Sequence, residues 1–498
     1  MRALVVLIPL FPLAAGVIVA ALGWRTVTAW AGPLAAATVT GAGIALAVGI
    51  LDDGPVTALD QILRADALSA YMVIVIGCVA LVATSYGVGY VRAELEHGHT
   101  TARRARIYGV LVQGFIVAML SAVLADNLGV LWVAVEATTI ATAFLVGHRR
   151  TRASLEASWK YVVIGSVGVA LAFLGTVLVY FASRHTGTDA GASLNWSELV
   201  TLAPNLDPGV VRLAIGLLVV GYGTKIGLAP MHTWLPDAHS QAPAPVSALM
   251  SGVLLSVAMY ALLRYKVIAD AALGPEYLRG LLVAGALLSL AVAASLLLAQ
   301  RDYKRMRAYS SIEHMGLVAL GVAIGTPLAV GAALLHILGH GIGKAVLFCS
   351  SGEILHTTGT TEIGAVRGLL IRQPLLGGIF GLGVLALLGL PPFSLFASEL
   401  AIARAGVADG LGWAVGVAFV LVLVIFAAMV GHAQQMLLGD PDADVPGADL
   451  HSADAPVHRT SMTTAVPLVV GLSALALLGV SIWPIEQLLE SAANVVTG

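Results

Sequence analysis

Fourteen apolar segments follow one another along this chain, and each is about as long as a membrane is thick. A helix needs about 20 apolar residues to cross the hydrocarbon core, and in lipid it satisfies its own backbone hydrogen bonds. The sequence therefore predicts an all-α polytopic membrane protein of about 14 transmembrane helices. The expected spans lie near residues 3–22, 29–50, 66–91, 106–125, 128–147, 157–182, 210–230, 241–266, 278–299, 310–325, 328–356, 374–405, 411–437 and 463–485.

Composition agrees with this class and excludes others. Of the 498 residues, 58% are hydrophobic and 11% are charged, whereas soluble domains average about 25% charged residues. A net charge of −2 argues against nucleic acid as a partner. The two cysteines, Cys78 and Cys349, are too few and too far apart for an iron–sulfur cluster. We expect no metal or cofactor in this chain, so that partners perform any redox chemistry.

Basic residues predict the orientation, because short cytoplasmic loops are enriched in lysine and arginine. With the N-terminus outside, these loops hold fifteen of the 26 lysines and arginines, including the groups at 103–106, 149–152 and 301–307. Both termini are then expected outside. Three regions follow: helices 1–3 (1–104), a translocating core of helices 4–12 (105–405), and helices 13–14 (406–498). The last region contains an acidic segment, 439–460, expected to be a flexible cytoplasmic loop or a docking site.

Lys225 follows about fifteen apolar residues and precedes the sequence Gly-Leu-Ala-Pro, in which Pro230 is expected to break the helix. Broken helices at membrane depth line cavities and mark ion paths. A lysine in hydrocarbon costs several kcal/mol, and it usually faces a partner or water. We expect Lys225 to exchange protons with water at the break; a lysine that snorkels to the interface is the alternative. His232 and His239, in the polar stretch that follows, are accessory candidates.

Glu136 lies near the centre of its own apolar span, "NLGVLWVAVEATTIATAFLVG". A charge there is costly unless it is paired. We predict that Glu136 and Lys225 form a switching ion pair, in which the lysine holds its proton while the pair is closed and releases it when the carboxylate swings away. A purely structural carboxylate, hydrogen-bonded to a neighbouring helix, is the alternative.

His336, His340 and Lys344 recur at every fourth position and so share one helical face over about 12 Å. Histidine both accepts and donates protons near neutral pH, so this face is expected to form a proton relay. Glycines at 339, 341 and 343 leave room for water or for close packing. Two histidines that merely pack a helix interface are the alternative.

Glu399 follows a second proline break, at Pro391 and Pro392. The order of apolar helix, break and titratable residue repeats that around Lys225 and suggests inverted repeats. Lys160 lies one turn into its span with Glu156 four residues before it, so an interfacial ion pair is an alternative to proton transport. Glu313 stands at another span entrance, where proton access or partner contact is expected.

These motifs resemble the antiporter-like membrane subunits shared by respiratory complex I, membrane-bound hydrogenases and Mrp-type sodium/proton antiporters. The resemblance covers about residues 105–405 and depends on "TKIGLAPMHTWLPDAHSQAPAPVSALMSGVLL" and "HILGHGIGKAVLF". It is greatest to the F-type component of the hydrogenase-4 and formate hydrogenlyase relatives, where "MRAYSSIEHMG" and "WKY" are also similar.

The resemblance implies a role for each matching residue. Glu136 matches the carboxylate of the fifth span and Lys225 the lysine of the broken seventh span. The face of His336, His340 and Lys344 matches the central relay, and Glu399 matches the titratable residue of the broken twelfth span.

One position departs from the family pattern. Ser256 stands where many complex I relatives have a lysine or histidine in the eighth span, and a serine cannot store a proton near neutral pH. Water, Tyr260 or His336 would have to bridge the two half-paths there.

We therefore expect a non-redox, proton-translocating subunit of a prokaryotic group 4 membrane-bound hydrogenase in the cell membrane. Its partners would be other membrane subunits and a peripheral redox arm with iron–sulfur clusters and a nickel–iron site. A complex I-type NADH/quinone oxidoreductase, or an Mrp-type antiporter that exchanges sodium for protons without redox coupling, is the alternative.

Overall fold

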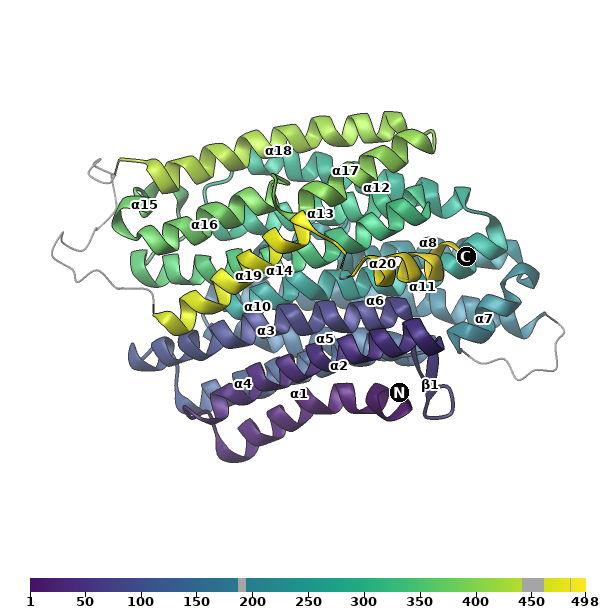
Figure 1. Cartoon of the computed structure of the whole chain (residues 1–498), viewed down its shortest axis with the longest axis horizontal. Helices are drawn as coiled ribbons and strands as arrows, with labels where there is room; N and C mark the ends of the chain where they lie inside the picture. Colours follow the sequence, from purple (N-terminus) through teal and green to yellow (C-terminus); the bar gives the residue numbers. More distant parts are fainter. Residues whose placement is uncertain (187–193, 441–460, 484) are drawn as a thin grey trace.

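The computed structural model describes residues 1–186, 194–440, 461–483 and 485–498. It confirms the all-α prediction. Helices lie side by side in alternating directions, and both chain ends lie in the right-hand half of Figure 1. The described part contains one small β-hairpin, formed by β1 (Val56–Ala58) and β2 (Leu63–Ala65). Most of the acidic segment predicted at 439–460 lies outside the described residues.

Long helices account for the predicted spans one by one. In chain order they are α1 (Arg2–Leu22), α2 (Ala31–Asp53), α3 (Ala67–Glu96), α4 (Ala102–Leu124), α5 (Leu128–Val146), α6 (Arg152–Arg184), α8 (Pro208–Ile226), α11 (Leu255–Leu273), α12 (Glu276–Leu298), α13 (Tyr303–Ile324), α14 (Pro327–Thr358), α16 (Pro374–Leu387), α17 (Ser394–Ala408), α18 (Gly412–Leu438) and α19 (Met462–Val480). Shorter helices are α7 (Trp196–Leu202), α9 (Trp234–Gln241), α10 (Ala244–Leu249), α15 (Leu369–Arg372) and α20 (Glu486–Thr497).

Twelve helical segments of the described chain are long and apolar enough to cross a membrane alone. They include α10 and α11, which are continuous through a π-helical turn, η5 (Met250–Leu254). The other two predicted spans are α13, whose charged residues make it less apolar, and the pair α16 and α17, which a break divides. The count of about 14 thus agrees with the fold.

Both predicted proline breaks occur. α8 ends at Ile226, and the chain then passes through the short turn η4 (Met231–Thr233) before α9 begins. Gly227 closes α8 in the left-handed conformation, at φ 85°, where a side chain would be strained. The second break separates α16 from α17 and contains Pro391 and Pro392.

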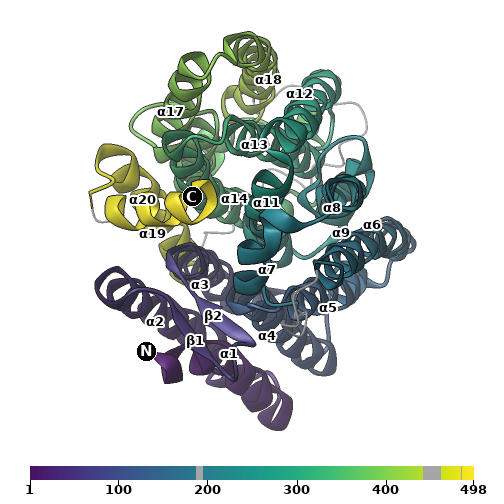
Figure 2. The same ribbon diagram turned by 90° about the vertical axis from the view of Figure 1, so that its right-hand side faces the viewer.

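The centre of the bundle is formed by α10, α11 and α14, whose most apolar 18-residue windows are wholly buried. Figure 2 shows α11 and α14 in the middle, with α1, α2 and α18 at the rim. The backbones meet at two glycines: a Cβ atom on Gly252 would lie 2.8 Å from the carbonyl oxygen of Gly341. Gly341 therefore serves the close packing of two helix backbones, which is one of the two roles expected for the glycines at 339, 341 and 343.

Candidate functional site

Lys225 is completely buried in the last turn of α8. Its Nζ donates to the hydroxyl of Tyr161 on α6, at 2.9 Å, and lies 4.7 Å from the centre of that ring. The Tyr161 hydroxyl is also 2.6 Å from Oγ1 of Thr142 on α5. The burial excludes the interfacial alternative, since a snorkelling lysine keeps its ammonium group in water.

Glu136 on α5 accepts from Thr139, at 3.0 Å, and from Ser166 on α6, at 3.3 Å. Lys225 donates to Tyr161 rather than to this carboxylate, so hydroxyl groups of α5 and α6 separate the two charges. The switching ion pair of Glu136 and Lys225 stays a prediction. The hydroxyl groups between them offer a polar connection. Glu136 is partly exposed, and it lines a groove of about 780 Å³ between α4, α5 and α6.

Tyr161→Phe tests this connection. The substitution removes one hydroxyl from the path between Lys225 and Glu136, and it leaves the ring in place. A hydrogen bond to a charged group is worth about 1.5–3 kcal/mol, so we expect proton transport to slow about tenfold or more. Proton uptake by proteoliposomes measures this. Unchanged transport would show that protons do not use the hydroxyl.

His239, an accessory candidate from the sequence, lies between the Lys225 region and α14. The Trp234 ring is 4.9 Å from Tyr161 and 6.2 Å from His239, and the His239 ring stacks on Phe348 of α14 at 5.3 Å. Both His239 ring nitrogens are buried without a partner in the described chain. Buried polar atoms of this kind are usually satisfied by water. Ring contacts through Trp234, His239 and Phe348 therefore connect the surroundings of Lys225 with α14.

Ser256 is completely buried in the first turn of α11, and its hydroxyl has no partner among the described residues. It follows η5, and π-helical turns often occur at functional sites. Tyr260, one turn later, belongs to the separate polar network described below. The bridge by water at Ser256 stays a prediction, and His239 is a second candidate for this role.

His336 on α14 makes hydrogen bonds at both ring nitrogens. Nδ1 lies 3.0 Å from Oγ of Ser398, whose own proton is donated to the carbonyl of Leu395 at 2.8 Å. We therefore assign His336 Nδ1–H as the donor and Nε2 as the acceptor. Nε2 is 3.1 Å from Nδ1 of His314 on α13, which must then donate. The result is a directed hydrogen-bond chain from α13 to α17.

His340 and Lys344 continue the same buried face. The His340 ring lies 5.1 Å from that of His314, and both of its nitrogens lack a partner in the described part of the chain. Lys344 donates to Oγ of Ser310, at 2.6 Å, and to the carbonyl of Arg307, at 2.7 Å. The predicted face of three titratable groups is therefore present and buried, and His314 extends it onto α13.

Glu399 lies on α17 beside the second break, where its carboxylate occupies the space that a side chain at Gly389 would fill. Glu399, His314 and His336 each present a ligand atom within 4.8 Å of the others. Two histidines and a carboxylate can hold zinc, but the short His314–His336 contact also suits a proton relay, which agrees better with the surrounding groups. Glu313, next to His314, is buried.

Lys160 differs from the other two lysines predicted in apolar spans. Its side chain is 47% exposed and pairs with Glu156, at 2.8 Å, and with Asp237, at 3.0 Å. This geometry favours the interfacial ion pair.

Lys304, which the charge pattern assigns to a loop, is instead buried in α13 and donates to the carbonyl of Ser240 at 2.7 Å. His232 is buried in η4, away from these contacts.

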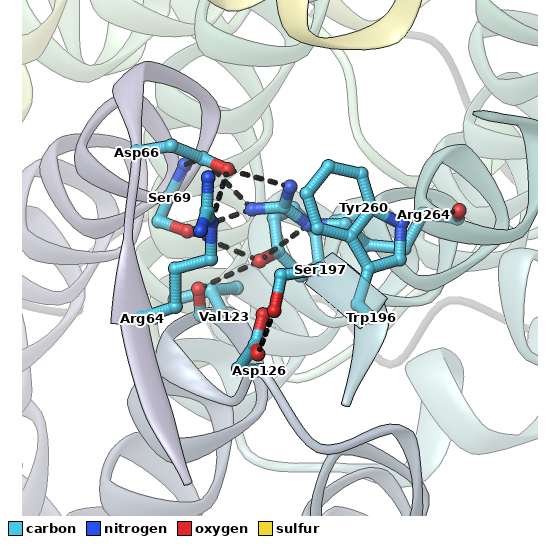
Figure 3. A network of polar contacts seen from close by, with 9 residues as sticks. All are labelled: Arg64, Asp66, Ser69, Val123, Asp126, Trp196, Ser197, Tyr260 and Arg264. Atoms are coloured by element: carbon cyan, nitrogen blue, oxygen red, sulfur yellow. Dashed lines mark hydrogen bonds and ion pairs between the residues drawn. The ribbon is translucent and has the colours of Figure 1, made fainter. Parts of the chain in front are cut away.

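A second polar network lies where the start of α3 meets the middle of α11 (Figure 3). Asp66 caps α3 by accepting from the Ser69 backbone N–H, and it forms a bidentate pair with Arg264 at 2.7 and 2.8 Å. Arg264 Nε also donates to Tyr260, whose hydroxyl donates to the carbonyl of Val123. We call the Asp66–Arg264 pair the outer clamp. Sequence inspection misses it because Arg264 stands beside Lys266 and looks like an ordinary span end.

The outer clamp is fully buried, with Asp66 1% and Arg264 3% exposed. Burial alone would raise the pKa of Asp66. The attraction and hydrogen bonds of Arg264, together with the Ser69 N–H and Arg64, outweigh burial and lower this pKa to about 2. Asp66 is therefore charged at neutral pH, and the clamp joins the start of α3 to α11.

Buried titratable groups along two broken helices and a central continuous helix define a class, the antiporter-like membrane subunits. The chain belongs to the family described as "NADH:quinone oxidoreductase/Mrp antiporter, TM", which matches residues 125–426. Members of this family that belong to complex I-type complexes do not carry the redox centres, which lie in other subunits.

Named relatives come from several complexes. The hydrogenase-4 component F homolog of Methylacidiphilum infernorum is 38% identical over 76% of this chain and 79% of its own length. Hydrogenase-4 component B of Escherichia coli is 32% identical over 68% of this chain and 50% of its own. A chain of the archaeal membrane-bound sulfane sulfur reductase is 25% identical, with a TM-score of 0.86 and coverage of 99% of this chain and 97% of that one. The family and the fold are therefore shown, and these relatives come from more than one kind of complex.

Proposed function

We propose that this chain translocates protons as a subunit of a redox-driven membrane complex of the hydrogenase-4 kind. One observation supports it most: eight titratable groups, six of them fully buried, follow one another through the bundle from α5 to the second broken helix. In order they are Glu136, Lys225, His239, His340, Lys344, His314, His336 and Glu399. The similarity to a hydrogenase-4 component F homolog supports this kind of complex.

Energy for transport has to come from partner subunits. Moving one charge against 100 mV costs about 2.3 kcal/mol, and two isolated cysteines give this chain no iron–sulfur site of its own. In this proposal iron–sulfur clusters and a nickel–iron site belong to a peripheral arm on the cytoplasmic side. Both termini face outward, and the arginine-rich ends of α3 and α4 face the cytoplasm.

Composition of the purified complex tests the kind of complex. We expect mass spectrometry of the native assembly to find hydrogenase large and small subunits with this chain. Small antiporter subunits in their place would identify an Mrp-type antiporter, and NADH-oxidising subunits a complex I-type enzyme. Either result would contradict the hydrogenase assignment.

Glu136→Gln tests the transport role. The amide keeps the hydrogen-bonding shape towards Thr139 and Ser166 but cannot hold a negative charge. We expect proton pumping to fall about tenfold or more. Loss of a proton-transfer group usually lowers a rate by a factor of about 10²–10⁴. The comparison is made on assembled complexes in proteoliposomes with equal redox-centre content. Normal pumping would leave Glu136 as a structural carboxylate.

A further inference from the structure

One group of titratable side chains lies outside the row from Glu136 to Glu399, where the C-terminal ends of α3 and α14 meet Arg149. Oε1 of Glu94 is 3.0 Å from Nε2 of His356, 3.6 Å from the Arg149 guanidinium and 3.9 Å from Nδ1 of His99. The Glu94 and His356 side chains are 10% and 15% exposed. They can therefore reach solvent while lying mostly within the protein.

Two tyrosines extend this group inward along α3. The Tyr90 ring stacks on His356 at 5.0 Å, and its hydroxyl accepts from Arg149 at 3.1 Å. One turn deeper, Tyr86 donates to Oε1 of Glu353 at 3.1 Å, and Glu353 is buried. We call Glu94, His356, Glu353, Tyr86 and Tyr90 the uptake cluster. Its members range from His356, which is partly exposed, to Tyr86, which is completely buried.

A small cavity adjoins the outer members of the uptake cluster. Its volume is about 10 Å³, and it is lined by Glu94, Tyr90, Arg149 and His148 among others. This is about the space that one water molecule needs, and the lining offers the polar partners that hold a buried water. One water molecule can therefore occupy the space beside Glu94 and Tyr90.

Arg307 lies between the uptake cluster and Lys344. It is completely buried, its Nε donates to Oγ of Ser351 at 2.6 Å, and its carbonyl accepts from Lys344 at 2.7 Å. Nη1 and Nη2 have no partner in the described chain, and the guanidinium lies over the Phe380 ring at 4.3 Å. Burying such groups without hydrogen bonds costs several kcal/mol, so we expect water beside Nη1 and Nη2.

We propose that protons enter this chain from the arginine-rich side at Glu94 and His356, pass through Glu353, and reach Lys344 through water beside Arg307. This inference rests on the proposed function. At each step one group accepts a proton as its neighbour releases one. Arg307 stays protonated, and its positive charge disfavours a second proton nearby while Lys344 is also charged. A new proton can therefore enter only after Lys344 has given up its own. Uptake then follows release, and the transport stays directional.

An ion pair that only fastens α3 to α14 is the competing interpretation, and a pH profile separates the two. If uptake limits transport, the rate in a Glu94→Ala or His356→Gln variant should rise as the pH on the uptake side falls, by up to about tenfold per unit, because each transfer consumes one proton. A fastening role would lower the rate by the same factor at every pH.

The experiment uses the complete complex in proteoliposomes and measures initial proton transport between pH 6 and 8 on the uptake side. We expect Glu94→Ala and His356→Gln to transport about tenfold more slowly at pH 8 and to recover at pH 6. Glu96→Ala is the matched control: it removes a 59% exposed carboxylate, two residues away, that pairs with Arg92. It should behave as wild type.

Glu353→Gln, which is isosteric, gives the same test if the surface variants fail to assemble. Variants that match Glu96→Ala, or whose defect is independent of pH, would overturn the uptake proposal. Normal pumping by Lys344→Met and Glu136→Gln would instead overturn the proposed function. The two failures are therefore distinguishable.

Discussion

Lys344→Met should abolish coupled proton transport and leave the complex assembled. The Lys344 ammonium is completely buried, and its two hydrogen-bond acceptors in the structure are neutral, Ser310 Oγ and the carbonyl of Arg307. Methionine has a similar length, so it keeps the packing while it removes an ammonium group that is costly to bury in an apolar interior. Loss of a proton-transfer group typically costs about 10²–10⁴ in rate. We therefore expect at least a hundredfold loss, measured with a pH-sensitive dye inside proteoliposomes.

Lys160→Met provides the comparison for Lys344→Met. Lys160 is half-exposed and pairs with Glu156 and Asp237, and exposed ion pairs contribute little, about 0–1 kcal/mol. We expect less than about a twofold change in transport. A large transport defect in Lys160→Met would support the original prediction that Lys160 carries protons. Normal transport by Lys344→Met would show that the α14 face only packs the bundle.

The sequence was sufficient to predict the fold and to select the strongest candidate site residues, because each of these carries its own signal. A lysine among apolar residues, as at Lys225 and Lys344, is costly enough to be noticed. Pro230 predicts the first broken helix, and the pair Pro391–Pro392 predicts the second. The face of α14 follows from helical periodicity alone, so its residues could be placed together without any tertiary information.

Contacts between distant segments could not be predicted in the same way. Tyr161 is an ordinary aromatic residue in its span, and only the packing of α6 against α8 brings it to Lys225. His239 and Phe348 meet across more than 100 residues. Lys304 looks like a loop residue by charge, but the carbonyls left free where α9 ends bind its ammonium group. Side chains whose role depends on tertiary contact carry no local pattern.

The outer clamp should have the largest effect on stability. Arg264 and Asp66 are 198 residues apart in sequence and form a buried bidentate pair. Removing one partner of such a pair leaves an uncompensated buried charge and costs about 3–5 kcal/mol. Asp66→Asn is the sharpest change, because asparagine still caps α3 but cannot neutralise Arg264. We expect its Tm in detergent to fall by several degrees.

Matched variants separate the charge from the packing. Asp66→Asn combined with Arg264→Gln should recover part of the loss, because neither charge then remains buried. Glu276→Gln, which removes an 81% exposed partner of Arg279, should leave the Tm unchanged. Asp66→Asn with a wild-type Tm would show that water, not Arg264, satisfies the site.

The pH dependence of stability gives an independent check on the outer clamp. The pKa of Asp66 is lowered to about 2 in the folded protein, whereas that of an unfolded aspartate is about 3.9. The ion pair therefore stabilises the fold fully above about pH 4, and this stabilisation, roughly 2–3 kcal/mol, is lost as the pH falls from 4 towards 2. The wild type should lose more stability over this interval than Asp66→Asn, because the variant has no carboxylate to protonate. Equal losses in the two proteins would mean that Asp66 is already neutral when folded, and an ion pair with Arg264 would then not be what joins the start of α3 to α11.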